Sequence, residues 1–242
     1  MFTDIHHHII YGVDDGAPDF ETAVQMLQKA DQQGVRRIIC TSHANPARSF
    51  FDADRYRMRL RKEQKYLQSQ RINIQLAEGC EIMWMELVPR LLSEGQLLTL
   101  NASRYVLVEF YPDDKFRRIR SALESLCVAG YTPILAHAER YRALRPWRRL
   151  RELRTGLHMA VQMNADTIIH VPDLGLLSDR TPRHFLTEGL VDICATDSHN
   201  LTGRSCRMRE AYRTLARMFG TETAKEMCMV NPNRIWNDEI IG

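Results

Sequence analysis

Asp4-Ile5-His6-His7-His8 stands near the start of the chain, and our expectation for the fold begins with this segment. It overlaps the end of the first apolar segment, residues 2–6, which we predict to be a β-strand. Side chains alternate between the two faces of a strand, so His6 and His8 should project together while His7 points away. A barrel can form a metal cluster when two imidazoles lie on one face of a strand and carboxylates from later in the chain lie beside them.

Later polar residues follow the same pattern, because they stand at the ends of apolar runs. The segments are Gly12-Val13-Asp14-Asp15-Gly16, Thr41-Ser42-His43, Glu78-Gly79-Cys80-Glu81, Val108-Glu109-Phe110, Ala136-His137-Ala138-Glu139-Arg140 and Thr196-Asp197-Ser198-His199-Asn200. Imidazole and carboxylate ligands without thiolate suit manganese, iron, zinc or cobalt. Since a carboxylate can bridge two ions, and two ions ~3.5–4 Å apart can bind one phosphoryl group, the pattern indicates metal-assisted hydrolysis.

Short apolar runs alternate with amphipathic stretches along the chain. We expect strands at 2–6, 37–41, 72–78, 105–110, 132–137, 160–164 and 192–196, and helices at 19–33, 53–70, 116–129, 141–157, 181–188, 204–219 and 222–229. Such alternation predicts a parallel sheet, and seven units of this kind predict a closed or nearly closed barrel with its active site at the carboxyl ends of the strands. An open doubly wound sheet would normally have a glycine-rich phosphate loop after its first strand, and Ile9-Ile10-Tyr11-Gly12 is not one.

Composition narrows the class of protein. A chain of 242 residues with 44% hydrophobic and 26% charged residues suits a single globular domain, residues 1–242. The net charge of +3 is too small to argue for nucleic acid as a partner. None of the six cysteines forms a C-x-x-C pair, no apolar stretch is long enough to cross a membrane, and the first strand leaves no room for a signal peptide. We therefore expect reduced thiols, a cytoplasmic location and no membrane insertion.

These segments, in this order, resemble the PHP (polymerase and histidinol phosphatase) family. More narrowly, the chain is similar to the manganese-dependent protein-tyrosine phosphatases of bacterial capsule and exopolysaccharide loci. Val13-Asp14-Asp15-Gly16 and His137-Ala138-Glu139-Arg140-Tyr141 separate this subfamily from other PHP proteins, and Asn231-Pro232 also fits. The resemblance covers essentially the whole chain and implies a distorted (β/α)7 TIM-like barrel of the PHP type.

The resemblance implies nine metal ligands and two phosphate-binding arginines. The ligands are His6, His8, Glu81 and Asp197 for one ion, Glu81, Glu109 and His137 for a second, and Asp15, His43 and His199 for a third. Three Mn2+ ions are implied, although iron, zinc or cobalt would suit the same ligands. Arg140 and Arg204 match the catalytic positions that bind the substrate phosphate. Asp4 would orient a ligand histidine; Asp14 could exchange roles with Asp15, and Glu109 could serve the second or the third ion.

The implied reaction is hydrolysis of phosphotyrosine in protein by a metal-bound hydroxide, with the arginines neutralising the phosphoryl oxygens. Phenolate, whose conjugate acid has a pKa of about 10, is a good leaving group, so a strong general acid is less essential. The implied partner is the autophosphorylated C-terminal tail of a bacterial tyrosine kinase that controls polysaccharide synthesis, and a homo-oligomer is possible. Tyr11, Phe50, Phe51 and Tyr111 could form an aromatic wall for the tyrosine ring.

Other functions stay open at this point. The same ligands could serve a phosphatase acting on histidinol phosphate or a sugar phosphate, or a phosphodiesterase, although a nuclease should carry more basic charge. A non-catalytic, metal-stabilised regulatory module would not need the complete ligand set. Cys228 and Arg234 have the C-x5-R spacing of thiol-based tyrosine phosphatases, but no glycine lies between them to let backbone N–H groups surround a phosphate.

Overall fold

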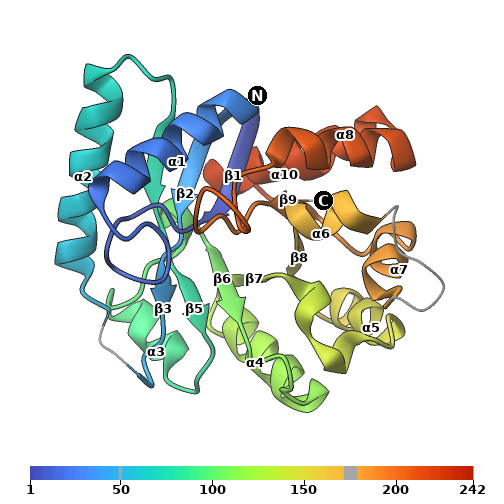
Figure 1. Cartoon of the computed structure of the whole chain (residues 1–242). Coiled ribbons are helices and arrows are strands. Elements are labelled where there is room, and N and C mark those ends of the chain that lie inside the picture. Colours follow the sequence, from blue (N-terminus) through green and yellow to red (C-terminus); the bar gives the residue numbers. More distant parts are fainter. Residues whose placement is uncertain (49–50, 172–178, 242) are drawn as a thin grey trace.

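The computed structural model describes residues 1–48, 51–171 and 179–241. A parallel β-sheet curls round on itself, and helices cover its outer side (Figure 1). The strands are β1 (Phe2–His7), β2 (Val35–Cys40), β3 (His43–Ala44), β4 (Gln75–Glu78), β5 (Glu81–Met83), β6 (Tyr105–Glu109), β7 (Thr132–Leu135), β8 (Ala160–Asn164) and β9 (Ile193–Ala195). The predicted parallel α/β architecture is therefore confirmed.

The sheet has two hydrogen-bonded parts, with strand orders β1-β2-β4 and β3-β5-β6-β7-β8-β9. They form one curled surface because β2 leads into β3, and β4 into β5, after short breaks. At the far edge the backbone N–H of His8 donates to the carbonyl of Ser198, and that of Asp197 to the carbonyl of His6, both at 2.9 Å. These two bonds join the end of β1 to the end of β9, so the first and last strands meet.

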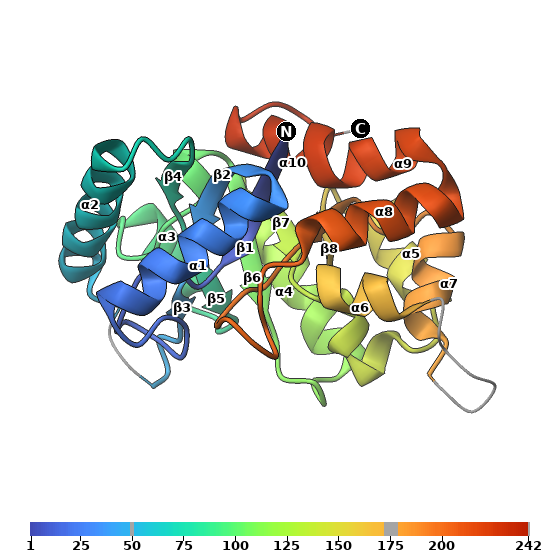
Figure 2. The same cartoon turned by 45° about the horizontal axis from the view of Figure 1, so that its top comes forward.

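The helices surround this sheet (Figures 1 and 2). They are α1 (Phe20–Gln33), α2 (Ala53–Ser69), α3 (Val88–Ser93), α4 (Phe116–Val128), α5 (Arg148–Gly156), α6 (Ala165–His170), α7 (Thr181–Thr187), α8 (Met208–Phe219), α9 (Thr221–Lys225) and α10 (Asn231–Trp236), with a π-helical turn at Glu226–Val230. Asp19 caps the start of α1 by accepting a hydrogen bond from the backbone N–H of Thr22, and Gly34 ends the helix with φ 87°. Among the described residues, none of the helices combines the length and apolarity that a bilayer crossing requires.

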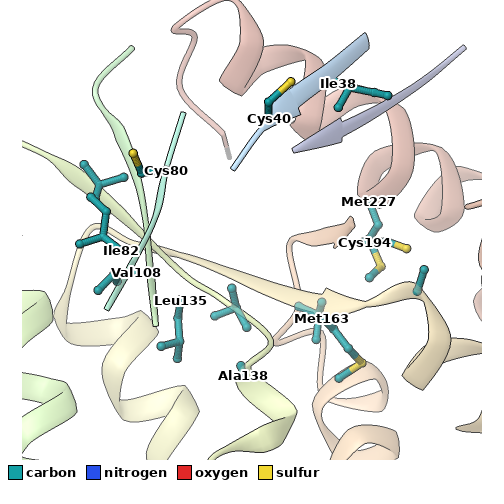
Figure 3. Packing of buried hydrophobic residues seen from close by; sticks show 14 of the residues in the cluster. Ile38, Cys40, Cys80, Ile82, Val108, Leu135, Ala138, Met163, Cys194 and Met227 are labelled. Atoms are coloured by element: carbon teal, nitrogen blue, oxygen red, sulfur yellow. The ribbon is translucent and has the colours of Figure 1, made fainter. Parts of the chain in front are cut away.

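Buried apolar side chains form two clusters on the two faces of the sheet. The inner cluster is built mainly from strand residues, with Ile235 of α10 among them, and comprises Ile5, Ile39, Ala77, Leu100, Tyr105, Leu107, Ile134, Ala136, Ala160, Ile193, Ala195 and Ile235. The larger outer cluster packs the sheet against the helices, and Figure 3 shows part of it, including Ile38, Cys40, Val108 and Cys194. Neighbours such as Ile38 and Ile39 belong to different clusters, as the period of two in a strand requires.

Several predicted boundaries are wrong, each for a local reason. The predicted helix 141–157 is divided, because Pro146 precedes α5 and only a short 3-10 turn forms at Arg142–Leu144. The predicted helix from residue 204 begins at Met208, since the carbonyl of Arg204 accepts bonds from His199 N and Asn200 N in a loop. The predicted strand 72–78 begins at Gln75, and the two-residue β3 and three-residue β5 are too short to give a periodic signal.

Candidate active site

Glu81, the first residue of β5, lies at the centre of a group of four imidazoles. Its Oε2 atom lies 3.1 Å from His6 Nε2, 3.2 Å from His8 Nε2 and 3.1 Å from His43 Nδ1. Its Oε1 atom lies 2.7 Å from His137 Nε2. The Glu81 side chain is 1% exposed. A buried carboxylate with both oxygens turned to imidazoles is arranged as a bridging ligand would be.

Other predicted ligands join this group from the loops that follow β1 and β9. Asp197 Oδ1 lies 3.3 Å from His6 Nε2 and 3.4 Å from His199 Nδ1. Asp15 Oδ1 lies 3.3 Å from His199 Nε2 and 3.4 Å from Nε2 of His43. Asp197 therefore connects His6 with His199, and Asp15 connects His199 with His43.

Glu109 completes the set at the end of β6. Its Oε1 lies 3.1 Å from His43 Nδ1 and its Oε2 lies 3.7 Å from His137 Nε2. Glu109 therefore stands between His43, predicted for the third ion, and His137, predicted for the second. The structure thus brings all nine predicted ligands into one continuous cluster, which we call the nine-residue cluster.

The sheet explains why these side chains converge. Leu107 and Ala195 belong to the inner cluster, and Glu109 and Asp197 follow two residues later on β6 and just beyond β9, so they continue the same inward row. The row ends in strained backbone at Asp197 (φ 52°) and at His137 (φ 30°), which follows β7. Left-handed conformations are uncommon for such residues and cluster at functional sites, because surrounding contacts must hold them in place.

An irregularity in β1 places polar side chains on both sides of this strand. The pairing of β1 with β2 shifts register between Asp4 and His7, so strict alternation is lost there. Ile5 packs in the inner cluster and His6 and His8 face Glu81, whereas Asp4 and His7 lie near Cys206 instead. The prediction that His7 points away from His6 and His8 agrees with this arrangement.

Asp4, which was predicted to orient a ligand histidine, contacts the backbone of His6 and not an imidazole ring. Its carboxylate accepts hydrogen bonds from the backbone N–H and hydroxyl of Thr196 and from the backbone N–H of His6, at 3.0 Å for Thr196 N. Asp4 therefore fastens β1 to the end of β9 and contacts only the backbone of His6. The register shift turns its side chain away from the imidazole rings of the ligand histidines.

Asp14, and not Asp15, contacts the Nδ1 atom of the His8 imidazole ring. Asp14 Oδ2 lies 2.8 Å from His8 Nδ1 and accepts the backbone N–H of His43 at 2.9 Å. The loop that carries both acids needs Gly16, because a Cβ atom there would lie 2.2 Å from the backbone oxygen of His8. The arrangement favours Asp15 over Asp14 as the residue inside the cluster.

Sequence reasoning missed a row of polar side chains on β8. The Gln162 amide oxygen lies 3.2 Å from His6 Nδ1 and accepts the backbone N–H of His137 at 2.7 Å. The Gln162 amide nitrogen donates to Asn164 Oδ1 at 2.7 Å, and Asn164 Nδ2 donates to Asp197 Oδ2 at 2.8 Å. Two amides in a buried strand, one at its centre and one at its last residue, were the available signal. Groups that hold the second nitrogen of a ligand imidazole fix its tautomer and orientation.

The two predicted phosphate-binding arginines lie at the same carboxylate. Arg140 Nη2 donates to Asp197 Oδ2 at 2.7 Å, and Arg204 Nη2 donates to Asp197 Oδ1 at 2.9 Å. Their side chains are 42% and 37% exposed, so both guanidinium groups reach the surface as well as the cluster.

Opposite charges dominate the electrostatics of the cluster. Burial would raise the pKa of Glu81, but His6 and His137 hold that pKa well below its ordinary value. Burial would lower the pKa of His8, but Asp14 and Glu81 raise it to about 9; burial likewise acts against His43, whose pKa Asp15 and Glu109 raise to about 11. By contrast, burial and the charge of His8 lower the pKa of His7 to about 3.

The donor set fits divalent metal ions. Three groups of its side chains each offer ligand atoms within 4.8 Å of one another: His6, His8, Glu81 and Asp197; His8, Asp15, His43 and His199; and His43, Glu81 and Glu109. Within the described parts of the chain, Glu81 Oε2 and His199 Nε2 are buried polar atoms without a hydrogen-bond partner, although both face the cluster. Buried polar atoms normally have partners, and cations would supply them here.

A cleft of about 430 Å³ opens beside the cluster. It is lined by Val13, Asp14, Asp15, His43, Asn45, Arg48, Met83, Glu109 and Tyr111. Of the four aromatic residues predicted to form a wall, Tyr111 lines this cleft, and Phe51 lines the adjoining pocket with His43. Tyr11 instead packs on Phe20 with ring centroids 5.6 Å apart, and Phe50 lies outside the described residues.

The C-x5-R alternative has no support in the geometry. Cys228 is completely buried in the π-helical turn, and burial of this kind does not make a thiol reactive. Arg234 forms an ion pair with Glu226 at 3.1 Å.

A parallel sheet with convergent imidazoles and carboxylates at its carboxyl end is the architecture of a metal-dependent hydrolase. The family model described as "Capsular polysaccharide synthesis, CpsB/CapC" matches residues 2–237, and the chain belongs to this family. It is 33% identical over 248 residues to the tyrosine-protein phosphatase CpsB of Streptococcus pneumoniae, covering 98% of this chain and 99% of that protein. It is 32% identical to the tyrosine-protein phosphatase YwqE of Bacillus subtilis, covering 90% of this chain and 85% of that protein.

Solved structures agree with this assignment. One of them comes from a study of YwqE from B. subtilis and CpsB from S. pneumoniae, which describes the two proteins as unique metal-dependent tyrosine phosphatases. It matches this chain with a TM-score of 0.90 at 29% identity, and the match covers 99% of this chain and 96% of that one. A D-hydantoinase structure has a TM-score of 0.51 at 11% identity, covering 94% of this chain and 69% of that one. This second likeness concerns the fold alone.

Proposed function

We propose that this chain is a metal-dependent protein-tyrosine phosphatase that hydrolyses phosphotyrosine in protein. The observation that carries the proposal is Glu81, a buried carboxylate whose two oxygens contact four imidazoles at 3.2 Å or less. The names of the relatives from S. pneumoniae and B. subtilis support the same substrate. In this proposal residues 1–242 form one domain, and the curled sheet is a distorted (β/α)7 barrel of the PHP type.

The nine-residue cluster would hold three divalent ions, with Mn2+ as the expected metal. His6, His8, Glu81 and Asp197 would bind one ion, and their mutual distances support this grouping. Asp15, His43 and His199 would bind another, supported by the grouping of these three with His8. Glu81, Glu109 and His137 would bind the remaining ion. Divalent ions supply Lewis-acid activation of water and neutralisation of phosphoryl charge.

The arginines would bind the phosphate. In the structure Asp197 accepts bonds from Arg140 and Arg204, and both guanidinium groups are partly exposed. Guanidinium groups pair well with phosphate oxygens and remain charged at all relevant pH values. Arg140 and Arg204 are therefore the residues that we expect to stabilise the charge on the transferred phosphoryl group.

The cleft beside the cluster is suited to a tyrosine side chain. Met83 and Tyr111 offer apolar and aromatic surface, while Arg48 and Asn45 offer polar contacts. Departure of a phenolate demands less proton donation than departure of an alkoxide. The chain can therefore use positioning and charge stabilisation without a dedicated general acid.

The biological partner in this proposal is the phosphorylated C-terminal tail of a bacterial tyrosine kinase that controls capsule or exopolysaccharide synthesis. Membership of the CpsB/CapC family, whose model is described by capsular polysaccharide synthesis, supports that setting. Such a tail would be reached in the cytoplasm. We do not propose nucleic acid as a partner, and a homo-oligomer remains compatible with this function.

A substrate panel tests the proposal. With Mn2+ present we expect a phosphotyrosine peptide to be hydrolysed with a kcat/KM at least ten-fold above those for histidinol phosphate and for a phosphodiester. Preference for histidinol phosphate would assign the chain to small phosphate esters, and preference for the phosphodiester would make it a nuclease-like enzyme. Binding of the peptide without turnover of any substrate would indicate a regulatory module.

A further inference from the structure

A second group of metal-ligating side chains lies behind the active site, on the other side of the irregular strand β1. Its members are Asp4 and His7 of β1 and Cys206 of the loop before α8. One potential ligand atom from each lies within 4.8 Å of the others. All three residues are buried, with 0%, 0% and 1% of their surface exposed. None of them belongs to the nine-residue cluster.

His7 carries the independent observation that points to a ligand. Both of its ring nitrogens are buried, and neither has a hydrogen-bond partner in the described parts of the chain. A neutral imidazole carries one N–H donor and one acceptor nitrogen, so complete burial of both without partners is costly. Ser198, which forms an isolated parallel bridge with His7 and lies just beyond β9, also has a buried hydroxyl without a partner in these parts of the chain.

The donors of this group differ chemically from those of the active site. Cysteine sulfur is absent from the nine-residue cluster, whereas here it joins one imidazole and one carboxylate. A thiolate and a carboxylate together balance the charge of a divalent cation. Sulfur, nitrogen and oxygen donors in one site favour zinc or cobalt over manganese, with four ligands in a tetrahedral arrangement.

We propose that Asp4, His7 and Cys206 form a buried site for a zinc-type divalent cation, separate from the catalytic cluster. The carboxylate of Asp4 is already oriented by the backbone N–H and hydroxyl of Thr196, as the carboxylate ligands of metals commonly are. The ion would join β1 to the loop between β9 and α8. That loop carries Arg204, so the ion would fasten a phosphate-binding residue to the sheet.

Cobalt provides a direct test, because a cysteine thiolate bound to Co2+ gives an intense near-ultraviolet charge-transfer band, which imidazole and carboxylate ligands do not give. The protein is produced in cobalt-supplemented medium, so that the ion can enter the buried site while the chain folds. All variants carry Cys127→Ala, since Cys127 is the cysteine that is not buried. We expect the band in this parent protein, with about one more cobalt ion bound per chain than in the Cys206→Ala variant.

The matched control is Cys228→Ala, which removes another buried thiol from a different element. We expect the band to disappear in Cys206→Ala, to weaken or disappear in His7→Ala, and to persist in Cys228→Ala. Absence of the band from the parent would overturn the site and assign the space around His7 to water. A band that survives in Cys206→Ala, or that is lost equally in Cys228→Ala, would also overturn it.

Discussion

Two buried glutamates, Glu81 and Glu63, show how differently this molecule treats the same side chain. Both residues are 0% exposed. Glu81 lies among four imidazoles, which hold its pKa well below the ordinary value. Glu63 of α2 accepts one weak bond from the backbone N–H of Tyr11 at 3.4 Å, and burial raises its pKa to about 8, against the opposing charges of Arg59 and Lys62.

Burial by itself therefore does not identify a functional acid. An ionised carboxylate is stable inside a protein only where opposite charges or donors surround it. Glu81 satisfies this condition and can bind cations, whereas Glu63 is expected to be protonated at neutral pH. Four substitutions test the separate roles of these side chains and of the groups around Glu81.

Glu81→Gln should have the largest effect. It keeps the size of the side chain but removes the charge that binds ions, so we expect phosphotyrosine kcat/KM to fall by at least about 10³-fold, together with the metal content. Glu78→Gln is the control, because Glu78 stands on the preceding strand and pairs with Arg57 instead. Near-normal activity of Glu81→Gln would contradict the assigned role of this carboxylate.

Arg204→Ala should have the next largest effect. Losing one charged donor to the phosphate should lower kcat/KM by ~10²–10³-fold while the metal content stays unchanged. Arg207→Ala provides a control in the same segment, since Arg207 pairs with Asp166 and Glu210. Kinetics like those of Arg207→Ala would remove Arg204 from the phosphate-binding role.

Gln162→Leu should have an intermediate effect. Removing the amide that supports His6 and the backbone of His137 should weaken metal affinity by about 10–100-fold, and excess Mn2+ should restore most of the activity. Gln75→Leu is a suitable control, because Gln75 is an exposed strand glutamine bonded to Arg37. If the affinity is unchanged, the hydrogen bond to His6 is not needed to orient the ring.

Glu63→Gln should have the smallest effect, and only on stability. The pKa of Glu63 is higher in the folded chain, about 8, than its ordinary value of 4.5. The folded state therefore keeps the proton that the unfolded state has lost, so stability falls as pH rises from 4.5 to 8. We expect the melting temperature of Glu63→Gln to match wild type near pH 4, below the ordinary pKa of a glutamate, and to exceed it at pH 8.5. An equal difference at both pH values would contradict the raised pKa.

Much of this site could be predicted from the sequence, because the period of two places every second residue of a strand on the inner face. Glu109 and Asp197 extend rows that begin with Leu107 and Ala195. Asp4 could not be placed in this way, since one irregularity in β1 reverses the side on which its carboxylate lies.

Other features depend on contacts that no local pattern encodes. Gln162 is one polar residue within a strand until the fold places His6 and His137 beside it. Glu63 occupies the buried stripe of α2 with Tyr56, Leu60 and Leu67, so helical periodicity would predict its burial but not its protonation. The pairing of β3 with β5 likewise depends on the curl of the whole sheet.

The most direct measurement is phosphotyrosine hydrolysis through a cycle of chelation and metal return. After EDTA treatment and dialysis we expect no detectable turnover, and addition of Mn2+ should restore it along with at least two bound ions per chain. Prior alkylation with iodoacetamide should change neither step, because the nine-residue cluster contains no cysteine. Activity that survives chelation but is lost on alkylation would show that the imidazoles and carboxylates around Glu81 do not carry the reaction.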